Sequence, residues 1–351
     1  MNLRESTKSV KIGKNLVIGG NNEVVIQSMC NIKTSKTSEV IEQINNCSLL
    51  GAKLMRVSVM DEADALSIKE IVKNVNIPIV ADIHFDYKLA ILAMENGASK
   101  IRINPGNIGG KEKVEKIIEC AKKHNVSIRI GVNSGSMDKE IYNYDCKLSA
   151  QLMIDSIEKY VKIFENCGFF DLVLSLKSSS VLETIEAYTL ASKKFKYPLH
   201  IGITEAGIKD ISTVRSCAGL APLLYNGIGN TIRISITASP EEEIKVCKKL
   251  LHDLGLYENY PTLISCPTCG RTEVNLQELS SKVSDFLETY NKKITVAIMG
   301  CVVNGPGEGK NADIGLAGGK NEYVLFKKGQ IIKKVNQNEA FDELIEMIKN
   351  Y

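Results

Sequence analysis

The first 255 residues repeat one pattern: a short apolar run rich in β-branched residues, then a longer stretch with apolar residues every three or four positions. Runs of the first kind are typical of buried parallel strands, and stretches of the second kind indicate amphipathic helices. The pattern occurs eight times. The expected strands are VVIQSM (24–29), LMRVSV (54–59), PIVADIH (78–84), KIRIN (100–104), SIRIGVN (127–133), LVLSLK (172–177), HIGITEA (200–206) and TIRISIT (231–237).

The helical stretches have recognisable starts. TSEVIEQINNCSLLGA begins at Thr37, GKEKVEKIIECAKKHN at Gly110, and PEEEIKVCKKLLHDLG at Pro240, where Ser239 and Pro240 form the expected cap. Eight strand–helix units of this length predict an α/β fold, a (β/α)8 barrel of the TIM type. A doubly wound open sheet is the alternative, but no glycine-rich phosphate loop follows Met29. The segment SVKIGKNLVIGG (9–20) predicts a hairpin that closes the bottom of the barrel.

The composition changes after Gly255, which divides the chain into a barrel domain, 1–255, and a smaller α+β domain, 256–351. Two domains are also expected from a length of 351 residues. In the second domain LYENYPTLIS (256–265) is interpreted as a linker. The elements expected after it are a helix at 276–290, a strand at 293–300, strands in IGLAGG and EYVLFKKGQIIKKV, and a final helix in EAFDELIEMIKNY.

The composition indicates an ordinary soluble protein, with 44% hydrophobic and 24% charged residues. No run approaches the roughly 18 apolar residues that a membrane span needs. The opening segment MNLRESTKSVKIGK lacks the apolar centre of a secretory signal, so we expect a cytoplasmic protein without a membrane partner. A net charge of +3 gives no reason to expect a nucleic-acid partner.

Polar and charged residues share one face of several expected strands, because alternate residues of a strand point the same way. We expect these cations to converge at the barrel mouth, where a ligand with two or more phosphate charges would neutralise them. The alternative is internal ion pairing with Asp82, Asp171 and Glu205. The residues on this face are Arg56, Asp82, His84, Arg102, Asn104, Arg129, Asn133, Lys177, Arg233 and Ser235.

Glu205, in GITEAG at the end of the seventh strand, is an acid in this cationic setting. It is a candidate to pair with an arginine or to donate or accept a proton.

Three of the ten cysteines, Cys266, Cys269 and Cys301, follow the change in composition. The pair in CPTCG resembles half a zinc ribbon, but no histidine and no second C-x-x-C follows. Three thiolates without nitrogen ligands favour an iron–sulfur cluster, with the Glu308 carboxylate as an exchangeable fourth ligand. Cysteines inside helical patterns, such as Cys47, Cys120 and Cys247, are interpreted as small core residues.

The motifs MGCVVNGPGEG (299–309), SCPTCGRT (265–272), ADIHFDYKLA, KIRINPGNIG, IRIGVNSGS, GITEAG and GNTIRIS resemble those of 4-hydroxy-3-methylbut-2-enyl diphosphate synthases. The likeness runs through nearly the whole chain and fits the short bacterial form with two domains. One departure is Cys30 in QSMCN, where the family has threonine, so no site residue is assigned to the following loop.

The resemblance implies an oxidoreductase of the non-mevalonate isoprenoid pathway that reductively opens 2-C-methyl-D-erythritol 2,4-cyclodiphosphate. It implies one 4Fe–4S cluster per chain on Cys266, Cys269, Cys301 and Glu308, in a sulfite/nitrite-reductase-like domain fed by flavodoxin or ferredoxin. It also implies that the cationic face binds the diphosphate, that Glu205 and Glu308 are catalytic, and that the chain is dimeric.

Topology independently favours a homodimer with composite sites. The eighth helix returns the chain to the bottom of the barrel, whereas the cationic strand ends lie at the top, so we expect each cluster domain to cap its partner's barrel. Two other functions stay open on the residues alone. One is a phosphate-ligand binding protein with a zinc-ribbon tail, and the other is a barrel transferase of the pterin-binding type.

Overall fold

The computed structural model describes residues 3–133, 150–290, 292–301, 309–320 and 322–351. The chain divides into two compact units, Met1–Leu256 and Tyr257–Tyr351. Within the described ranges no helix is long and apolar enough to cross a membrane.

The first unit contains an eight-stranded parallel sheet that closes on itself, which confirms the TIM-type barrel. A bridge between Leu174 and Leu199 joins the two ends of the sheet, whose order is β8-β7-β6-β5-β4-β3-β10-β9. The strands are β3 (Val25–Met29), β4 (Leu54–Val59), β5 (Ile79–Ile83), β6 (Lys100–Ile103), β7 (Ser127–Asn133), β8 (Leu172–Lys177), β9 (His200–Ile201) and β10 (Thr231–Ile232).

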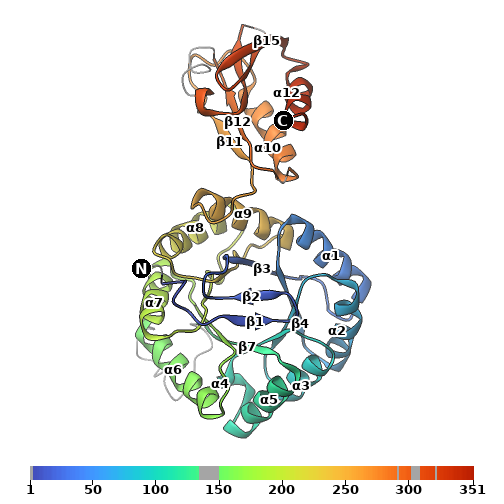
Figure 1. Cartoon of the computed structure of the whole chain (residues 1–351), viewed down its shortest axis with the longest axis vertical. Helices are drawn as coiled ribbons and strands as arrows, with labels where there is room; N and C mark the ends of the chain where they lie inside the picture. Colours follow the sequence, from blue (N-terminus) through green and yellow to red (C-terminus); the bar gives the residue numbers. More distant parts are fainter. Residues whose placement is uncertain (1–2, 134–149, 291, 302–308, 321) are drawn as a thin grey trace. The chain divides into compact units, whose positions relative to one another are not determined.

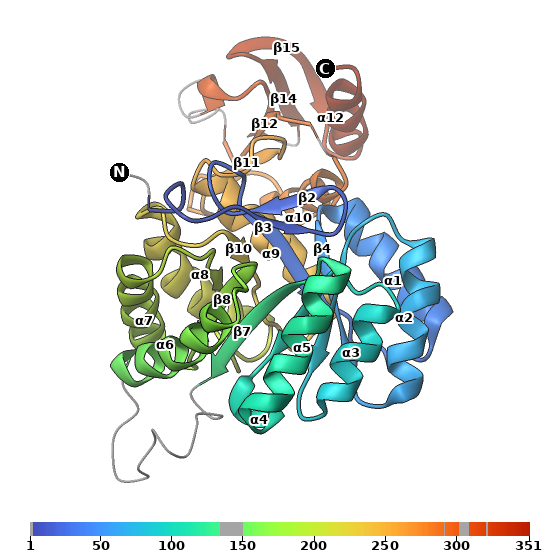
Figure 2. The same cartoon turned by 60° about the horizontal axis from the view of Figure 1, so that its bottom comes forward.

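Helices surround these strands, as Figures 1 and 2 show. Their apolar faces are buried, because the sheet removes that side of each helix from water. A one-turn helix, α4 (Pro105–Ile108), was not expected; Asn104 caps it by accepting a hydrogen bond from Gly106 N at 3.2 Å. The surrounding helices are α1 (Thr37–Leu50), α2 (Glu62–Asn74), α3 (Tyr87–Glu95), α5 (Lys111–His124), α6 (Ala150–Asn166), α7 (Val181–Lys194), α8 (Lys209–Tyr225) and α9 (Pro240–Asp253).

The seventh and eighth strands are much shorter than the expected ranges 200–206 and 231–237. Beyond Ile201 and Ile232 the backbone bonds irregularly: Thr204 N donates to Ser178 O and Thr237 N donates to Gly207 O. The alternation of apolar residues continues past the last regular backbone pairs of both strands. The sequence therefore overestimates the length of both strands.

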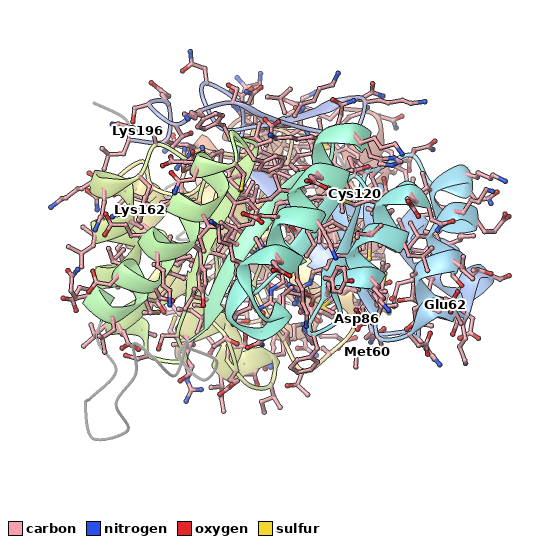
Figure 3. All side chains as sticks on the ribbon, turned by 90° about the horizontal axis from the view of Figure 1, so that it is seen from below. Met60, Glu62, Asp86, Cys120, Lys162 and Lys196 are labelled. Atoms are coloured by element: carbon pink, nitrogen blue, oxygen red, sulfur yellow. The ribbon has the colours of Figure 1, made fainter. Side chains whose placement is uncertain are left out.

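A hairpin of β1 (Val10–Ile12) and β2 (Leu16–Ile18) precedes the barrel, as expected. Its buried side chains form one apolar cluster with Val25, Leu54 and Val80, which lie near the N-terminal ends of β3, β4 and β5. The hairpin therefore closes the bottom of the barrel. Figure 3 shows the opposite ends: Met60 and Asp86 lie at the end where the strands finish, and Lys196 lies at the other.

The second unit is a five-stranded sheet in the order β11-β12-β13-β14-β15, with one apolar core against two helices. The segment interpreted as a linker contains a strand, because residues 262–265 pair in parallel with β12. This strand has four residues, which are too few for the alternation of side chains to distinguish a strand from an extended connection. The elements are β11 (Thr262–Ser265), α10 (Leu276–Glu288), β12 (Thr295–Met299), β13 (Ile314–Gly319), β14 (Glu322–Lys327), β15 (Gln330–Asn336) and α12 (Ala340–Lys349).

Candidate functional site

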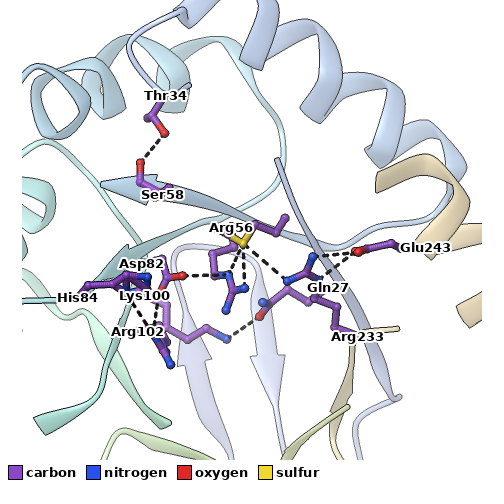
Figure 4. Close-up of polar contacts among 11 residues, drawn as sticks. Gln27, Thr34, Arg56, Ser58, Asp82, His84, Lys100, Arg102, Arg233 and Glu243 are labelled. Carbon is purple, nitrogen blue, oxygen red and sulfur yellow. Dashed lines mark hydrogen bonds and ion pairs between the residues drawn. The ribbon is translucent and has the colours of Figure 1, made fainter. Parts of the chain in front are cut away.

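Asp82 on β5 is shared by two arginines from the neighbouring strands. Arg102 Nη1 lies 3.2 Å from Asp82 Oδ1, and Arg56 Nε lies 3.6 Å from Oδ2. Burial opposes ionisation of Asp82, but Arg56, Arg102 and Arg129 outweigh it and lower the pKa of the carboxyl to about 2. Asp82 therefore stays charged and holds two guanidinium groups in place (Figure 4).

Arg233 is held by an acid from outside the barrel, Glu243 in the first turn of α9. Arg233 Nε and Nη2 each donate to the Glu243 carboxylate at 2.9 Å. Ser28 Oγ at 2.6 Å and Ile236 N at 3.1 Å complete four donors to this buried carboxylate. The Met29 sulfur lies between Arg233 and Arg56 and accepts from Arg56 Nη2 at 2.8 Å.

Arg129 and Lys177 are buried cations without an acid of their own in the described chain. Burial lowers the pKa of both groups well below the ordinary value, and neighbouring cations act in the same direction. Two glycines make room for cations inside the barrel. A Cβ at Gly202 would lie 2.5 Å from Lys177 Nζ, and one at Gly131 would lie 3.1 Å from Arg102 Nε.

The barrel interior therefore holds more positive than negative charge. Arg56, Arg102, Arg129 and Lys177 face Asp82, while Arg233 is balanced by Glu243. Confining uncompensated cations costs several kcal/mol per charge, and an anionic ligand whose oxygen pairs match the guanidinium fork relieves that cost. The ion-pair alternative is correct in part, but its acids are Asp82 and Glu243; neither Asp171 nor Glu205 pairs with a strand arginine among the described residues.

The remaining expected residues are spread over the same end of the barrel. His84 Nδ1 lies 3.3 Å from Arg102 Nη1, and Ser235 accepts at its backbone oxygen from Ser212. Glu205 is exposed and has a φ of 53°, a left-handed backbone that is costly for a side chain other than glycine. The side chain of Asn133 lies outside the described residues, although its backbone pairs in register with Lys177.

The three candidate cysteines follow neighbouring strands of the second unit. Cys266 comes directly after β11 and Cys301 comes two residues after β12; these strands are parallel, so both residues lie at the same edge of the sheet. Cys301 is buried and Cys269 is exposed. Glu308 lies outside the described residues.

The chemistry of these residues fits a thiolate-bound cluster. Gly300 N lies 3.2 Å from Cys266 Sγ, and N–H donors of this kind stabilise cluster sulfur ligands. The backbone N–H of Arg271 and the Arg271 charge lower the pKa of the Cys269 thiol, despite an opposing effect of desolvation. Across the described ranges, no three Cys, His, Asp or Glu side chains are already arranged to hold a metal ion.

Sequence reasoning missed Glu243 and Lys100. Glu243 stands in the run PEEEIK, where the helical period places it one turn before Cys247 on the buried face of α9, but the pattern gives no indication of its partner. Lys100 opens the expected strand KIRIN, and the period-two pattern does place it on the face of Arg102. The strand period therefore indicates an inward-pointing Lys100.

Two family models together match most of the chain. The model described as the GcpE TIM-barrel domain matches residues 7–248, and the model described as the GcpE protein C-terminal domain matches residues 262–350. The chain is 50% identical over 347 residues to 4-hydroxy-3-methylbut-2-en-1-yl diphosphate synthase (flavodoxin) of Caldanaerobacter subterraneus, covering 99% of this chain and 98% of that protein. The enzyme of the same name from Clostridium perfringens is 49% identical, with 99% of each chain covered.

Solved structures resemble the chain at the level of fold alone. The sialic acid synthetase of Leptospira borgpetersenii superposes with a TM-score of 0.51 at 15% identity, covering 71% of this chain and 90% of that one. Dihydropteroate synthase of Stenotrophomonas maltophilia gives a TM-score of 0.50 at 15% identity, covering 65% and 93%. The second likeness therefore gives no support to a pterin-type transferase.

Proposed function

The chain belongs to the GcpE family, and on that premise we propose that it reductively opens 2-C-methyl-D-erythritol 2,4-cyclodiphosphate to 4-hydroxy-3-methylbut-2-enyl diphosphate and water. The observation that carries the proposal is the excess of buried cations in the barrel, combined with three cysteines of thiolate-ligand type in the second unit. The excess of buried cations does not serve the fold alone, because it costs stability when no anion is bound.

The barrel cations bind the diphosphate of the substrate in this proposal. Arg56 and Arg102 are already oriented by Asp82, and Arg233 by Glu243, so little side-chain entropy is lost when phosphate oxygens arrive. Lys177 and Arg129 bring charge without an acid to neutralise it. The assignments of His84, Asn104, Asn133 and Ser235 to the same ligand rest on their position at the strand ends.

Cys266, Cys269, Cys301 and Glu308 hold one 4Fe–4S cluster in this proposal. When bound, such a cluster supplies electrons and a Lewis-acidic iron to a carbon–oxygen bond. Glu205 stands at the barrel end where the cations gather and holds or donates the proton that the departing oxygen needs. Its strained backbone fits a position selected for chemistry over stability. The names of the relatives support flavodoxin as the electron donor.

The short connection between the two units supports a homodimer with composite sites as part of this proposal. The helix α9 ends at Asp253, at the end of the barrel opposite the cationic strand ends. The six residue steps from Leu256 to the strand at Thr262 span at most about 21 Å, which only equals the ~21 Å length of α9 itself. A partner chain can supply the cluster unit without that restriction.

The experiment that tests this function begins with protein purified without oxygen. It should contain iron and sulfide in equal amounts, absorb visible light, and convert the cyclodiphosphate to the allylic diphosphate only when a reductant is present. Cys266→Ala should lose both the iron and the turnover. A colourless protein that retains one zinc per chain would support the zinc-ribbon alternative and contradict the proposal.

A further inference from the structure

A second group of polar side chains lies beneath the substrate-facing arginines, at the centre of the barrel. Alternate strands of such a barrel contribute four side chains to each layer. The register pairs give one layer of Arg56, Arg102, Ser175 and Arg233, and beneath it one of Gln27, Val80, Arg129 and His200. Lys100 rises from the layer below, and its Nζ reaches Gln27 Oε1 at 3.5 Å (Figure 4). Gln27, Lys100, Arg129 and His200 are called the floor cluster.

The floor cluster is fully enclosed and has more donors than acceptors. Gln27, Lys100 and His200 are 0% exposed and Arg129 is 2% exposed. Gln27 Nε2, Arg129 Nε and Nη1, and His200 Nε2 have no hydrogen-bond partner. His200 Nδ1 lies 2.6 Å from Thr231 Oγ1, and the contact of Lys100 with Gln27 is long for a charged donor. This environment therefore does not satisfy an ammonium group.

The charged groups around Lys100 are nearly all positive. They come from six strands and comprise Arg56, Asp82, Arg102, Arg129, Lys177 and His200. Arginines keep their charge at any ordinary pH. The group that loses its proton, and so relieves the repulsion among these cations, is therefore a lysine or the histidine. Lys177 is partly open to solvent, at 8% exposure, whereas Lys100 has no such outlet. Burial lowers the pKa of Lys100 well below its ordinary value, and Arg129 and Arg56 act in the same direction.

We propose that Lys100 is uncharged in the ligand-free barrel and takes up one proton when the anionic substrate binds above the floor cluster. The inference rests on the proposed function, because it takes the cyclodiphosphate as the anion. Burial and the neighbouring arginines together keep Lys100 neutral, and a diphosphate between the upper arginines cancels their repulsion and adds an attraction that opposes the effect of burial. Lys100 does not contact the substrate in this proposal. It gains a proton when the negatively charged ligand binds and loses that proton when the ligand leaves.

The expected signature is a linkage between substrate affinity and pH. Between the pKa values of Lys100 in the free and bound states, binding takes up one proton, so the Kd rises tenfold for each pH unit. A purely structural lysine gives no such slope.

The test is calorimetric titration of the cluster-loaded protein with the cyclodiphosphate, without reductant, in buffers of different ionisation enthalpy from pH 7 to 9. Wild type should take up about one proton per site. Lys100→Met and Lys100→Gln should each lower that uptake by one proton and flatten the pH dependence of the Kd. His200→Asn should keep the uptake.

Unchanged proton uptake in both Lys100 variants would overturn the inference. So would proton uptake that is retained in Lys100→Met but lost in His200→Asn or in Lys177→Met. Failure of wild type to bind the cyclodiphosphate at all would instead contradict the proposed function. The two failures are therefore distinguishable.

Discussion

Asp82 shows how a single acid can order a cationic site. Its carboxylate contacts Arg56 and Arg102, and all three side chains are mostly buried. Removing a partner from such a group leaves uncompensated buried charge, which costs more than the pair itself contributes. Asp82 is therefore required for the barrel to tolerate its arginines when no substrate is bound.

Asp82→Asn should destabilise the chain by about 3 kcal/mol at neutral pH. The pKa of Asp82 is lowered to about 2 in the folded chain, so its contribution is present above the unfolded value of 3.8 and is lost as the pH falls toward 2. The gap between wild type and variant should narrow by about 1 kcal/mol by pH 3 and by about 2 kcal/mol by pH 2. Urea unfolding at pH 7, 5 and 3 measures it, and a gap that does not change with pH would refute the ion-pair role.

Lys100 should destabilise the folded chain at pH 7, in contrast to Asp82. Its lowered pKa means that the unfolded chain binds more protons, so wild-type stability should rise with pH up to about pH 10. Lys100→Met should therefore be more stable than wild type at pH 7, and its advantage should shrink by up to about 1.4 kcal/mol per pH unit. Urea unfolding from pH 7 to 10 needs no substrate. A constant difference between the two proteins would show that Lys100 stays charged.

The residues of the site were predictable from the sequence where their chemistry is carried by strand periodicity. Arg56, Arg102 and Lys177 all lie inside the barrel, as the alternation indicates. Their partners were not predictable, because an ion pair between distant elements leaves no local pattern. Glu243 is more than 200 residues from Ser28, which it contacts.

At the scale of elements, the pattern predicts a strand well where its own regular ladder is long. The expected limits of β4, β7 and β8 agree with the structure residue for residue. The limits fail at β9 and β10, where the chain leaves the ladder to form the site, and at β11, a short strand within a segment rich in tyrosine and proline. Tertiary hydrogen bonding sets the limits of these three strands, and local strand propensity does not predict it.

The helix α9 offers a matched test of how an element positions the site. Glu243 is buried against Arg233, whereas its neighbour Glu242, at 23% side-chain exposure, forms partly exposed surface pairs with Lys209 and Lys245. Glu243→Gln should raise the KM for the cyclodiphosphate at least tenfold and lower stability by about 2 kcal/mol, because Arg233 loses its charged partner. Glu242→Gln should change stability by less than 1 kcal/mol and leave KM unchanged, since exposed pairs contribute little. Equal effects of both changes would mean that Glu243 only stabilises α9 and does not position Arg233.

At the scale of the whole molecule, the proposed reaction needs two units that have separate cores. The barrel supplies binding charge, and the second unit supplies thiolates at one sheet edge. The connection between them contains a few extended residues, because β11 belongs to the second sheet. The two-unit organisation could be inferred from composition alone, whereas the pairing of units between chains needs a measurement.

The most direct test of the central claim, that barrel cations and cluster cysteines of two chains form one reductive site, is a mixing experiment under anaerobic conditions. Cys301→Ala and Arg102→Met should each be inactive toward the cyclodiphosphate with reductant, while wild type turns it over. After random subunit exchange, an equal mixture should recover about a quarter of wild-type activity, because half of the dimers contain one intact composite site. A mixture that stays inactive although exchange is demonstrated, or a wild type that never reduces the cyclodiphosphate, would contradict the account.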